Sequence, residues 1–404
     1  MFHAYLSRVS LLQHRSSVVA IVAALPWIIT PLVVIARMAQ SCTLNEESPE
    51  LPADAPRTTV IIPARNEAHN IALCLRSVLL SPYAPLGVIV VDDHSTDATA
   101  RIAREIAASD PRVHVLTNPD LPPDWFGKQW ACCNGAQAAT GDILIFVDAD
   151  TRIAPDLITR SVNGMLRTAA DLYSVIGRQE MHTFWERMIQ PQIFNMLGTR
   201  YGGTELVNRS PHAYDKIANG QYLMIRRSAY EAMGGHAIVR TYVAEDLMLA
   251  QTFFAAGRKT VVVLGWDQLA TRMYTSLRDL VSGWRKNVYA GGRHAVPGGR
   301  VGQLLFPVML PMPALMELVP LAVLLAGAFG LIPAAVTLWS GIVTAALLLW
   351  WIFVYVVNGE KVWYALLFPV GAAALLYILI SATASGSNVA WKGRQYTSED
   401  PGMP

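Results

Sequence analysis

Two aspartates follow an apolar run in the segment "ILIFVDADT", residues 143–151. Its first five residues are apolar, which predicts a buried strand, and Asp148 and Asp150 come directly after it. Side chains two apart on an extended backbone point to the same face, so these two carboxylates converge. Negative charge at the end of a buried strand is costly unless something positive compensates it. The pair predicts a site for a hard cation, Mg²⁺ or Mn²⁺, although an aspartate turn after a strand gives the same pattern.

Two further acidic pairs occupy similar positions. Asp92 and Asp93 end the predicted strand 87–93, where they either accept hydrogen bonds from a ribose or a base, or cap the next helix. Glu245 and Asp246 open a predicted helix, where the helix dipole favours acids. A carboxylate there is also a candidate base that removes a proton from an attacking hydroxyl.

A basic segment, residues 278–300, holds five cationic residues against one acid and precedes the longest apolar block of the chain. It has two interpretations. One is the ordinary positive flank of a membrane span. The other is that Trp284, Arg285 and Lys286 contact an acceptor or a diphosphate.

Apolar strands alternate with helices in the part of the chain that carries these acids. The expected strands are 59–63, 87–93, 112–116 and 142–148, and the expected helices are 67–80, 95–108 and 128–139. Such alternation predicts an α/β fold with a mainly parallel sheet covered on both faces. Ligands bind such sheets beyond the carboxyl ends of the strands, which is where the acids lie. The helix at 95–108 is expected to be capped by Ser95 or Thr96.

Three other stretches are nearly free of charge: 16–36, 304–357 and 362–384. A helix needs about 20 apolar residues to cross a bilayer, so these stretches predict membrane spans, the first an uncleaved anchor. Only Glu317 interrupts the C-terminal spans, which is too little charge for a transporter. The formal net charge of +2 gives no support to a nucleic-acid partner, and the four cysteines show no metal-type spacing.

Five motifs in order now point to a family. "VIIPARNE", "VIVVDDHSTDAT", "GKQWACCNGAQAATGDILIFVDADT", "GGH" and "AEDLMLA" together resemble the family 2 glycosyltransferases with a GT-A fold, over about residues 58–290. The segments "TFWER", "GWRKN" and "WKGRQY" resemble the membrane-anchored members that glucosylate lipids. Those members include the ceramide glucosyltransferase type and the carotenoid and hopanoid-associated enzymes.

The resemblance implies roles for residues at matching positions. Those that would bind the nucleotide-sugar are Pro63, Arg65, Glu67, Asp92, Asp93, Lys128, Asn134 and Asp148. Asp148 and Asp150 would hold the metal, Asp150 as the firmer ligand, and Asp246 would be the catalytic base supported by Glu245.

The implied function is inverting transfer of one sugar, glucose in most of the resembling enzymes, from a UDP-sugar to the hydroxyl of a membrane lipid. The lipid would be a carotenoid, a hopanoid, or a sphingolipid or glycerolipid. Processive synthases carry Q-x-x-R-W, whereas this chain has "SGWRKN", which argues against polymer synthesis. A polysaccharide synthase, a polyprenyl-phosphate glycosyltransferase and an inactive membrane scaffold remain as alternatives.

The expected organisation is a multi-pass protein of the cell (inner) membrane with its catalytic domain in the cytoplasm. In order, its parts are an anchor (1–40), a linker (41–57), the GT-A domain (58–290) with an interfacial helix (183–200), an interfacial or re-entrant segment (291–317), transmembrane helices (318–385) and a tail (386–404). The basic "WKGR" of the tail favours the cytoplasmic side, whereas a count of three C-terminal spans places it opposite.

Overall fold

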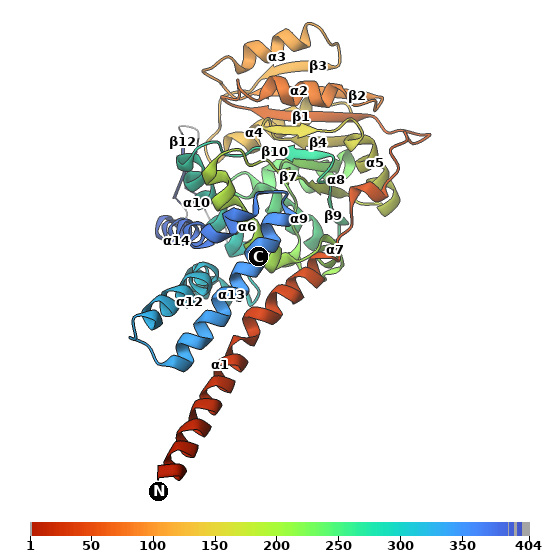
Figure 1. Cartoon of the computed structure of the whole chain (residues 1–404). Helices are drawn as coiled ribbons and strands as arrows, with labels where there is room; N and C mark the ends of the chain where they lie inside the picture. Colours follow the sequence, from red (N-terminus) through yellow and green to blue (C-terminus); the bar gives the residue numbers. More distant parts are fainter. Residues whose placement is uncertain (1, 387, 392–393, 398–404) are drawn as a thin grey trace.

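A mixed sheet of seven strands, in the order β3-β2-β1-β4-β8-β6-β9, forms the centre of the soluble part (Figure 1). The computed structural model describes residues 2–386, 388–391 and 394–397, with side chains from 16 to 386. The strands are β1 (Thr58–Ala64), β2 (Leu86–Asp92), β3 (Val113–Thr117), β4 (Ile143–Val147), β6 (Leu172–Ile176), β8 (Tyr222–Arg226) and β9 (Thr260–Leu264). The four strands expected from the sequence are confirmed.

Strand direction decides where the site lies. The pairs β1/β2, β2/β3, β1/β4 and β6/β9 are parallel, and only β8 runs antiparallel to its neighbours β4 and β6. Six strands therefore end at one edge of the sheet, and β8 begins there. The expectation of an α/β fold with a mainly parallel sheet is confirmed.

Helices cover both faces, as the alternation predicted. They are α2 (Ile71–Leu79), α3 (Thr99–Ala107), α4 (Gly127–Ala138), α5 (Leu157–Thr168), α8 (Arg227–Met233) and α9 (Glu245–Ala255). Successive β1 residues bury on opposite faces: Val60 and Ile62 join a core with α2 and α5, and Ile61 joins one with α4 and α9.

One helix start was predicted wrongly. α3 begins at Thr99, and neither Ser95 nor Thr96 caps it. Instead the Asp97 carboxylate accepts a hydrogen bond from Thr99 N at 2.9 Å, while Ser95 Oγ accepts one from Asn66 N at 3.0 Å. The residues before the helix thus form a loop that is bonded to the loop after β1.

A small second sheet, β5-β10-β7, is built from the short strands that follow β4, β6 and β9 in the chain. Its strands are β5 (Thr151–Ile153), β7 (Arg178–Gln179) and β10 (Leu269–Thr271). In the sequence, β7 is followed by α6 (Phe184–Tyr201) and α7 (Thr204–Arg209), and β10 is followed by α10 (Leu277–His294).

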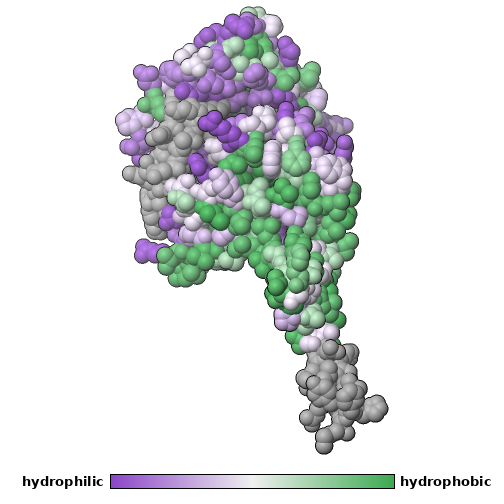
Figure 2. Space-filling view, turned by 60° about the vertical axis from the view of Figure 1, so that its left-hand side comes forward, coloured by the Kyte–Doolittle hydropathy of each residue, from purple (hydrophilic) through white to green (hydrophobic). Residues whose placement is uncertain are grey.

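Among the residues that the structure describes, four helical stretches are long and apolar enough to cross a membrane: 16–38, 299–328, 334–357 and 362–385. The helices concerned are α1 (Phe2–Met38), α11 (Gly299–Met309), α12 (Met312–Ala328), α13 (Ala334–Val357) and α14 (Phe368–Ser385). Figure 2 shows apolar side chains gathered over this end of the molecule and polar ones over the sheet. The hairpin β11 (Asn388–Trp391) and β12 (Arg394–Thr397) follows α14, while Lys392 and Gly393 of the "WKGR" tail lie outside the described residues.

A helix, α6, is present where the sequence predicted an interfacial helix, and it packs against the membrane-type helices. Met188, Ile189 and Ile193 are buried in one apolar core with residues of α10, α13 and α14. Pro191 lies inside α6, and a proline provides no N–H to the carbonyl four residues earlier. The Tyr355 hydroxyl of α13 donates to that carbonyl, Arg187 O, at 2.9 Å. Whether α6 also touches lipid remains a prediction.

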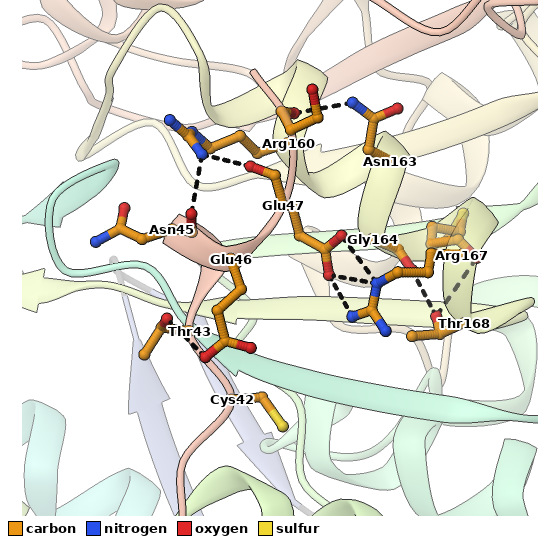
Figure 3. A network of polar contacts seen from close by, with 12 residues as sticks. Cys42, Thr43, Asn45, Glu46, Glu47, Arg160, Asn163, Gly164, Arg167 and Thr168 are labelled. Carbon is orange, nitrogen blue, oxygen red and sulfur yellow. Dashed lines mark hydrogen bonds and ion pairs between the residues drawn. The ribbon is translucent and has the colours of Figure 1, made fainter. Parts of the chain in front are cut away.

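The first part of the expected linker is bound to the domain, and we call residues 42–50 the anchor strap (Figure 3). Arg167 Nε donates to Glu47 Oε2 at 3.0 Å, and Asn163 Nδ2 donates to Ser48 O at 2.9 Å. Arg160 donates to the carbonyls of Asn45 and Glu47. The first helix is therefore tied to α5 through a bonded segment.

Candidate active site

Members of all three acidic pairs line one cavity of about 760 Å³ at the edge where the strands end. Ten of the residues predicted for the site line it: Pro63, Arg65, Glu67, Asp93, Lys128, Asp148, Asp150, Glu245, Asp246 and Lys286. They come from the ends of β1, β2 and β4 and from the starts of α4 and α9, with Lys286 on α10. The topology thus brings together residues that are more than 200 positions apart.

Lys128 joins two of the acidic pairs. Its Nζ lies 2.7 Å from Asp148 Oδ1 and 2.7 Å from Glu245 Oε1, so it links the end of β4 to the start of α9. Burial opposes the charge of the ammonium, but the attraction of the two carboxylates outweighs burial and raises its pKa well above the ordinary value. Burial tends to raise the pKa of Glu245, and the nearby Lys128 cation reverses this and lowers it.

Asp246 has the properties of a positioned base. Its Oδ2 accepts a hydrogen bond from Gly220 N at 2.7 Å, and its Oδ1 accepts one from Leu247 N at 2.8 Å. A Cβ at Gly220 would lie 3.0 Å from Asp246 Oδ2, so this close approach favours glycine. Burial and the charge of Glu245 raise the pKa of Asp246 to about 6. A carboxylate with that pKa accepts protons efficiently near neutral pH.

Asp93 is held by the amide of Asn118, which is held in turn by the amide of Asn134. Asn118 Nδ2 donates to Asp93 Oδ1 at 3.0 Å, and Asn134 Nδ2 donates to Asn118 Oδ1 at 2.9 Å. Arg65 Nη1 also donates to Asp93 O at 2.6 Å. Asn134 therefore reaches the cavity through Asn118 and Asp93, and does not line it itself.

The other three predicted residues outside the cavity lining are Asp92, Trp284 and Arg285. Asp92 is buried, and its Oδ1 accepts a hydrogen bond from Ser95 N at 3.3 Å. Trp284 is buried against Phe194, with ring centroids 5.6 Å apart. Arg285 precedes Lys286 on α10 but faces elsewhere, because adjacent helical residues do not share a face.

Several lining residues were not expected from the sequence. They are Asn219, Gly220 and Gln221 before β8, and Arg272, Tyr274, Ser282 and Asn287 on the membrane side. The dipeptide Asn219-Gly220 is a turn signal and directly precedes the apolar run that forms β8, so it could have indicated a strand that begins at this edge. No comparable local pattern marks Arg272 or Tyr274.

The cavity lining carries more negative than positive charge. It holds the acids Glu67, Asp93, Asp148, Asp150, Glu245, Asp246 and Asp279, against the cations Arg65, Lys128, Arg272 and Lys286. Within the described part of the chain, no three His, Cys, Asp or Glu side chains are grouped so as to hold a metal ion by themselves. The two carboxylates after β4 are nevertheless the hard oxygen donors that Mg²⁺ and Mn²⁺ take, usually together with substrate phosphates.

Comparison with known proteins identifies the class. Residues 59–234 match glycosyl transferase family 2, a segment that runs from β1 to the end of α8. Residues 59–234 thus form a domain of glycosyl transferase family 2, and the fold is of the GT-A type, as the motifs implied.

Its similarity to individual proteins is more limited. It is 31% identical over 242 residues to the 4,4'-diaponeurosporenoate glycosyltransferase of Staphylococcus aureus (strain USA300), which covers 59% of this chain and 62% of that protein. The protein of the same name from strain bovine RF122 / ET3-1 is 29% identical over 288 residues, 67% of this chain and 73% of that one.

A solved structure supports the fold. The mannosyltransferase PcManGT from Pyrobaculum calidifontis, in complex with GDP-Man and Mn²⁺, superposes with a TM-score of 0.52 at 19% identity. The match covers 92% of this chain and 98% of that one, so the similarity extends beyond the GT-A domain into the membrane-type helices.

Proposed function

We propose that this protein transfers a single sugar, glucose, from a UDP-sugar to the hydroxyl of a membrane lipid, with inversion at the anomeric carbon. The observation that carries the proposal is that the D-x-D pair and the Glu245-Asp246 pair line one cavity, whose far wall belongs to the membrane-facing core. The relative from Staphylococcus aureus acts, by its name, on a carotenoid acid, which supports a lipid acceptor here.

The donor half of the cavity would hold the nucleotide at Pro63, Arg65, Glu67 and Asp93. Its excess of carboxylates would repel a diphosphate, so we infer that a divalent cation enters with the donor. Asp148 and Asp150 are the residues that would hold Mg²⁺ or Mn²⁺, and such a cation supplies neutralisation of charge on the diphosphate.

Asp246 would act as the general base. It takes the proton from the acceptor hydroxyl while that oxygen forms its bond to the anomeric carbon. The bond between the anomeric carbon and the diphosphate oxygen breaks, and the electron pair leaves with UDP. One displacement inverts the configuration, so no sugar–enzyme adduct forms, unlike in retaining hydrolases. Lys128 would keep Glu245 in place beside Asp246, because Lys128 Nζ lies 2.7 Å from Glu245 Oε1.

The acceptor half supports a lipid that approaches from the bilayer. Ser282 and Lys286 of α10 line the cavity, while Leu280, Trp284 and Val288 of the same helix are buried with α6 and α14. One helix thus borders both the reaction cavity and the membrane-facing core. We further propose a multi-pass protein of the cell membrane with the GT-A domain in the cytoplasm, where nucleotide-sugars are made.

The test is transfer of radiolabel from UDP-glucose to extracted lipids in membranes that contain the full chain. Label in a single lipid species, lost in Asp246→Asn and on chelation with EDTA, would support the proposal. Asp142→Asn is the matched control, because Asp142 is exposed and pairs with Arg57 at 3.5 Å, away from the cavity lining. Label in a long water-soluble polymer would indicate a polysaccharide synthase, and label in a polyprenyl phosphate would indicate that transferase. Equal label in the lipids of wild type and all variants would mean that this protein does not catalyse the transfer, and the inactive scaffold would be the remaining alternative.

A further inference from the structure

The segment "TFWER", residues 183–187, leads into α6, and one of its side chains is bonded to the cavity lining. Glu186 Oε1 accepts a hydrogen bond from Arg272 Nη2 at 2.9 Å. Arg272 lines the cavity and its side chain is 32% exposed, whereas Glu186 is fully buried outside the lining. An ion pair thus connects the start of α6 to the reaction cavity.

The small second sheet determines where Arg272 lies. β10 runs antiparallel to β5, with Thr271 opposite Thr151. Arg272 comes directly after Thr271 and Asp150 directly before Thr151, so these two residues are neighbours where the pairing of the strands ends. Both line the cavity. Arg272 is therefore next to the carboxylate that the sequence predicted as the firmer metal ligand.

Glu186 is held in place by the first turn of α6. Its Oε2 accepts hydrogen bonds from the backbone N–H groups of His182 and Thr183, and Thr183 Oγ1 accepts one from Glu186 N at 3.3 Å. Thr183 and Glu186 form a capping box. Burial tends to raise the pKa of Glu186, but the hydrogen bonds from His182, Arg272 and Thr183 lower it. Arg272 is thus held by a fixed, ionised carboxylate.

A guanidinium held in this way suits a diphosphate. Arginine stays protonated and has five N–H donors, of which the bond to Glu186 uses only a part. Its planar fork matches phosphate oxygens, and a bound carboxylate sets the direction of that fork. A diphosphate that shares a divalent cation with Asp150 would lie beside Arg272.

We propose that Arg272 contacts the diphosphate of the donor and that Glu186 is a positioning residue, which holds Arg272 for this contact. The choice of UDP rests on the proposed function, whereas contact with a nucleoside diphosphate does not. The diphosphate gains negative charge as its bond to the anomeric carbon breaks, and a preset guanidinium stabilises that charge. The "TFWER" segment thereby links the donor to α6, which packs on the membrane-type helices.

The test separates the two roles of the capping box in the full chain, embedded in nanodiscs. Glu186→Gln keeps a residue type that completes a capping box but removes the charge that holds Arg272. Thr183→Ala is the matched control, because it removes the bond to Glu186 N and leaves the carboxylate with its partners. Isothermal titration calorimetry measures the Kd for UDP and for GDP at saturating Mn²⁺, and a thermal melt measures the stability of each preparation.

We expect Glu186→Gln to raise the Kd for UDP about tenfold and Arg272→Gln to raise it at least as much. Thr183→Ala should lower the melting temperature and leave this Kd within about twofold. The double variant Glu186→Gln/Arg272→Gln should bind UDP as weakly as Arg272→Gln alone, because the carboxylate acts through the guanidinium. It leaves neither charge without its partner, so its weaker binding decides the matter if a single variant does not fold.

An equal Kd for UDP in wild type and Arg272→Gln would overturn the proposal. A rise in KM for the lipid at unchanged UDP affinity would assign Arg272 to an acidic acceptor head instead. Glu186→Gln with a lowered melting temperature and unchanged UDP binding would reduce Glu186 to a helix cap. Since binding needs no sugar transfer, a wild type that binds GDP and not UDP would contradict the proposed donor, while a tenfold rise in the Kd for GDP in Arg272→Gln would still support this contact.

Discussion

The charged groups of the anchor strap are paired within the chain, whereas those of the cavity carry an excess of negative charge. In the strap, Glu47 is buried and paired with Arg167, and Asn163 and Arg160 bind its carbonyls (Figure 3). In the cavity, seven carboxylates face four cationic side chains, and Asp246 has a raised pKa. Groups that are satisfied within the chain serve the fold. Groups left with excess charge in a cleft are suited to a ligand that brings the missing charge.

The comparison predicts where substitutions act. Substitutions in the cavity should lower activity with little loss of stability, because its crowded carboxylates already destabilise the folded protein. Changes in the strap should lower stability and leave the chemical step intact.

The largest expected effect is that of Asp246→Asn. Loss of a general base lowers kcat by about 10³-fold, within the range such groups contribute. The melting temperature should stay equal or rise at pH 7.5, because burial and Glu245 disfavour the ionised form of Asp246 in the folded protein. Kinetics with labelled UDP-glucose and a thermal melt of the same preparation measure both. A variant with a tenth or more of wild-type kcat would contradict the assignment of Asp246 as base.

Asp150→Ala should have the second-largest effect on activity, with a loss of about 100-fold in kcat/KM and weaker Mn²⁺ binding. Titration with Mn²⁺ observed by electron paramagnetic resonance measures binding apart from turnover. The control is Asp156→Ala, because Asp156 lies outside the cavity and pairs with Arg160 at 2.6 Å. Unchanged Mn²⁺ binding in Asp150→Ala would remove this residue from the metal site.

The sequence predicted the cavity better than the strap, for a physical reason. Acids directly after buried strands signal the site by themselves, because parallel strands must end at one edge. The strap looked like a linker since its partners are remote in sequence: Arg167 is 120 residues from Glu47. Pairing over such a distance depends on how α5 packs and leaves no local pattern.

Residues on the acceptor side of the cavity were also hard to predict, because their positions depend on packing between elements that are remote in sequence. Trp284 and Lys286 are two positions apart and were predicted for one role, but their helix buries the first and directs the second into the cavity. The spacing of a motif does not specify which face of α10 meets the sheet. The wall residues Arg272 and Tyr274 depend on that same packing.

A smaller effect is expected from pH. The pKa of Asp246 is raised to about 6 by burial and by Glu245, so the base form predominates above pH 6 and is lost as the pH falls through that value. For a single protonation at this pKa, kcat/KM should therefore fall about fivefold from pH 6 to pH 5. A pH–rate profile at saturating Mn²⁺ measures this. Activity that stays level down to pH 4.5 would exclude a base with the raised pKa.

The smallest effect on activity is expected in the strap, from Arg167→Met. This change leaves the buried Glu47 carboxylate without its guanidinium, which should cost about 1–2 kcal/mol, a modest value because the Arg167 side chain is 63% exposed. The melting temperature of the full chain in nanodiscs should fall by a few degrees, while kcat stays within about twofold of wild type. Arg101→Met is the matched control, since Arg101 pairs with Glu105 at 2.6 Å on an exposed helix face and such pairs contribute little. If Arg167→Met lowered kcat tenfold without changing the melting temperature, the strap would position the cavity relative to its acceptor, and the division between the two regions would fail.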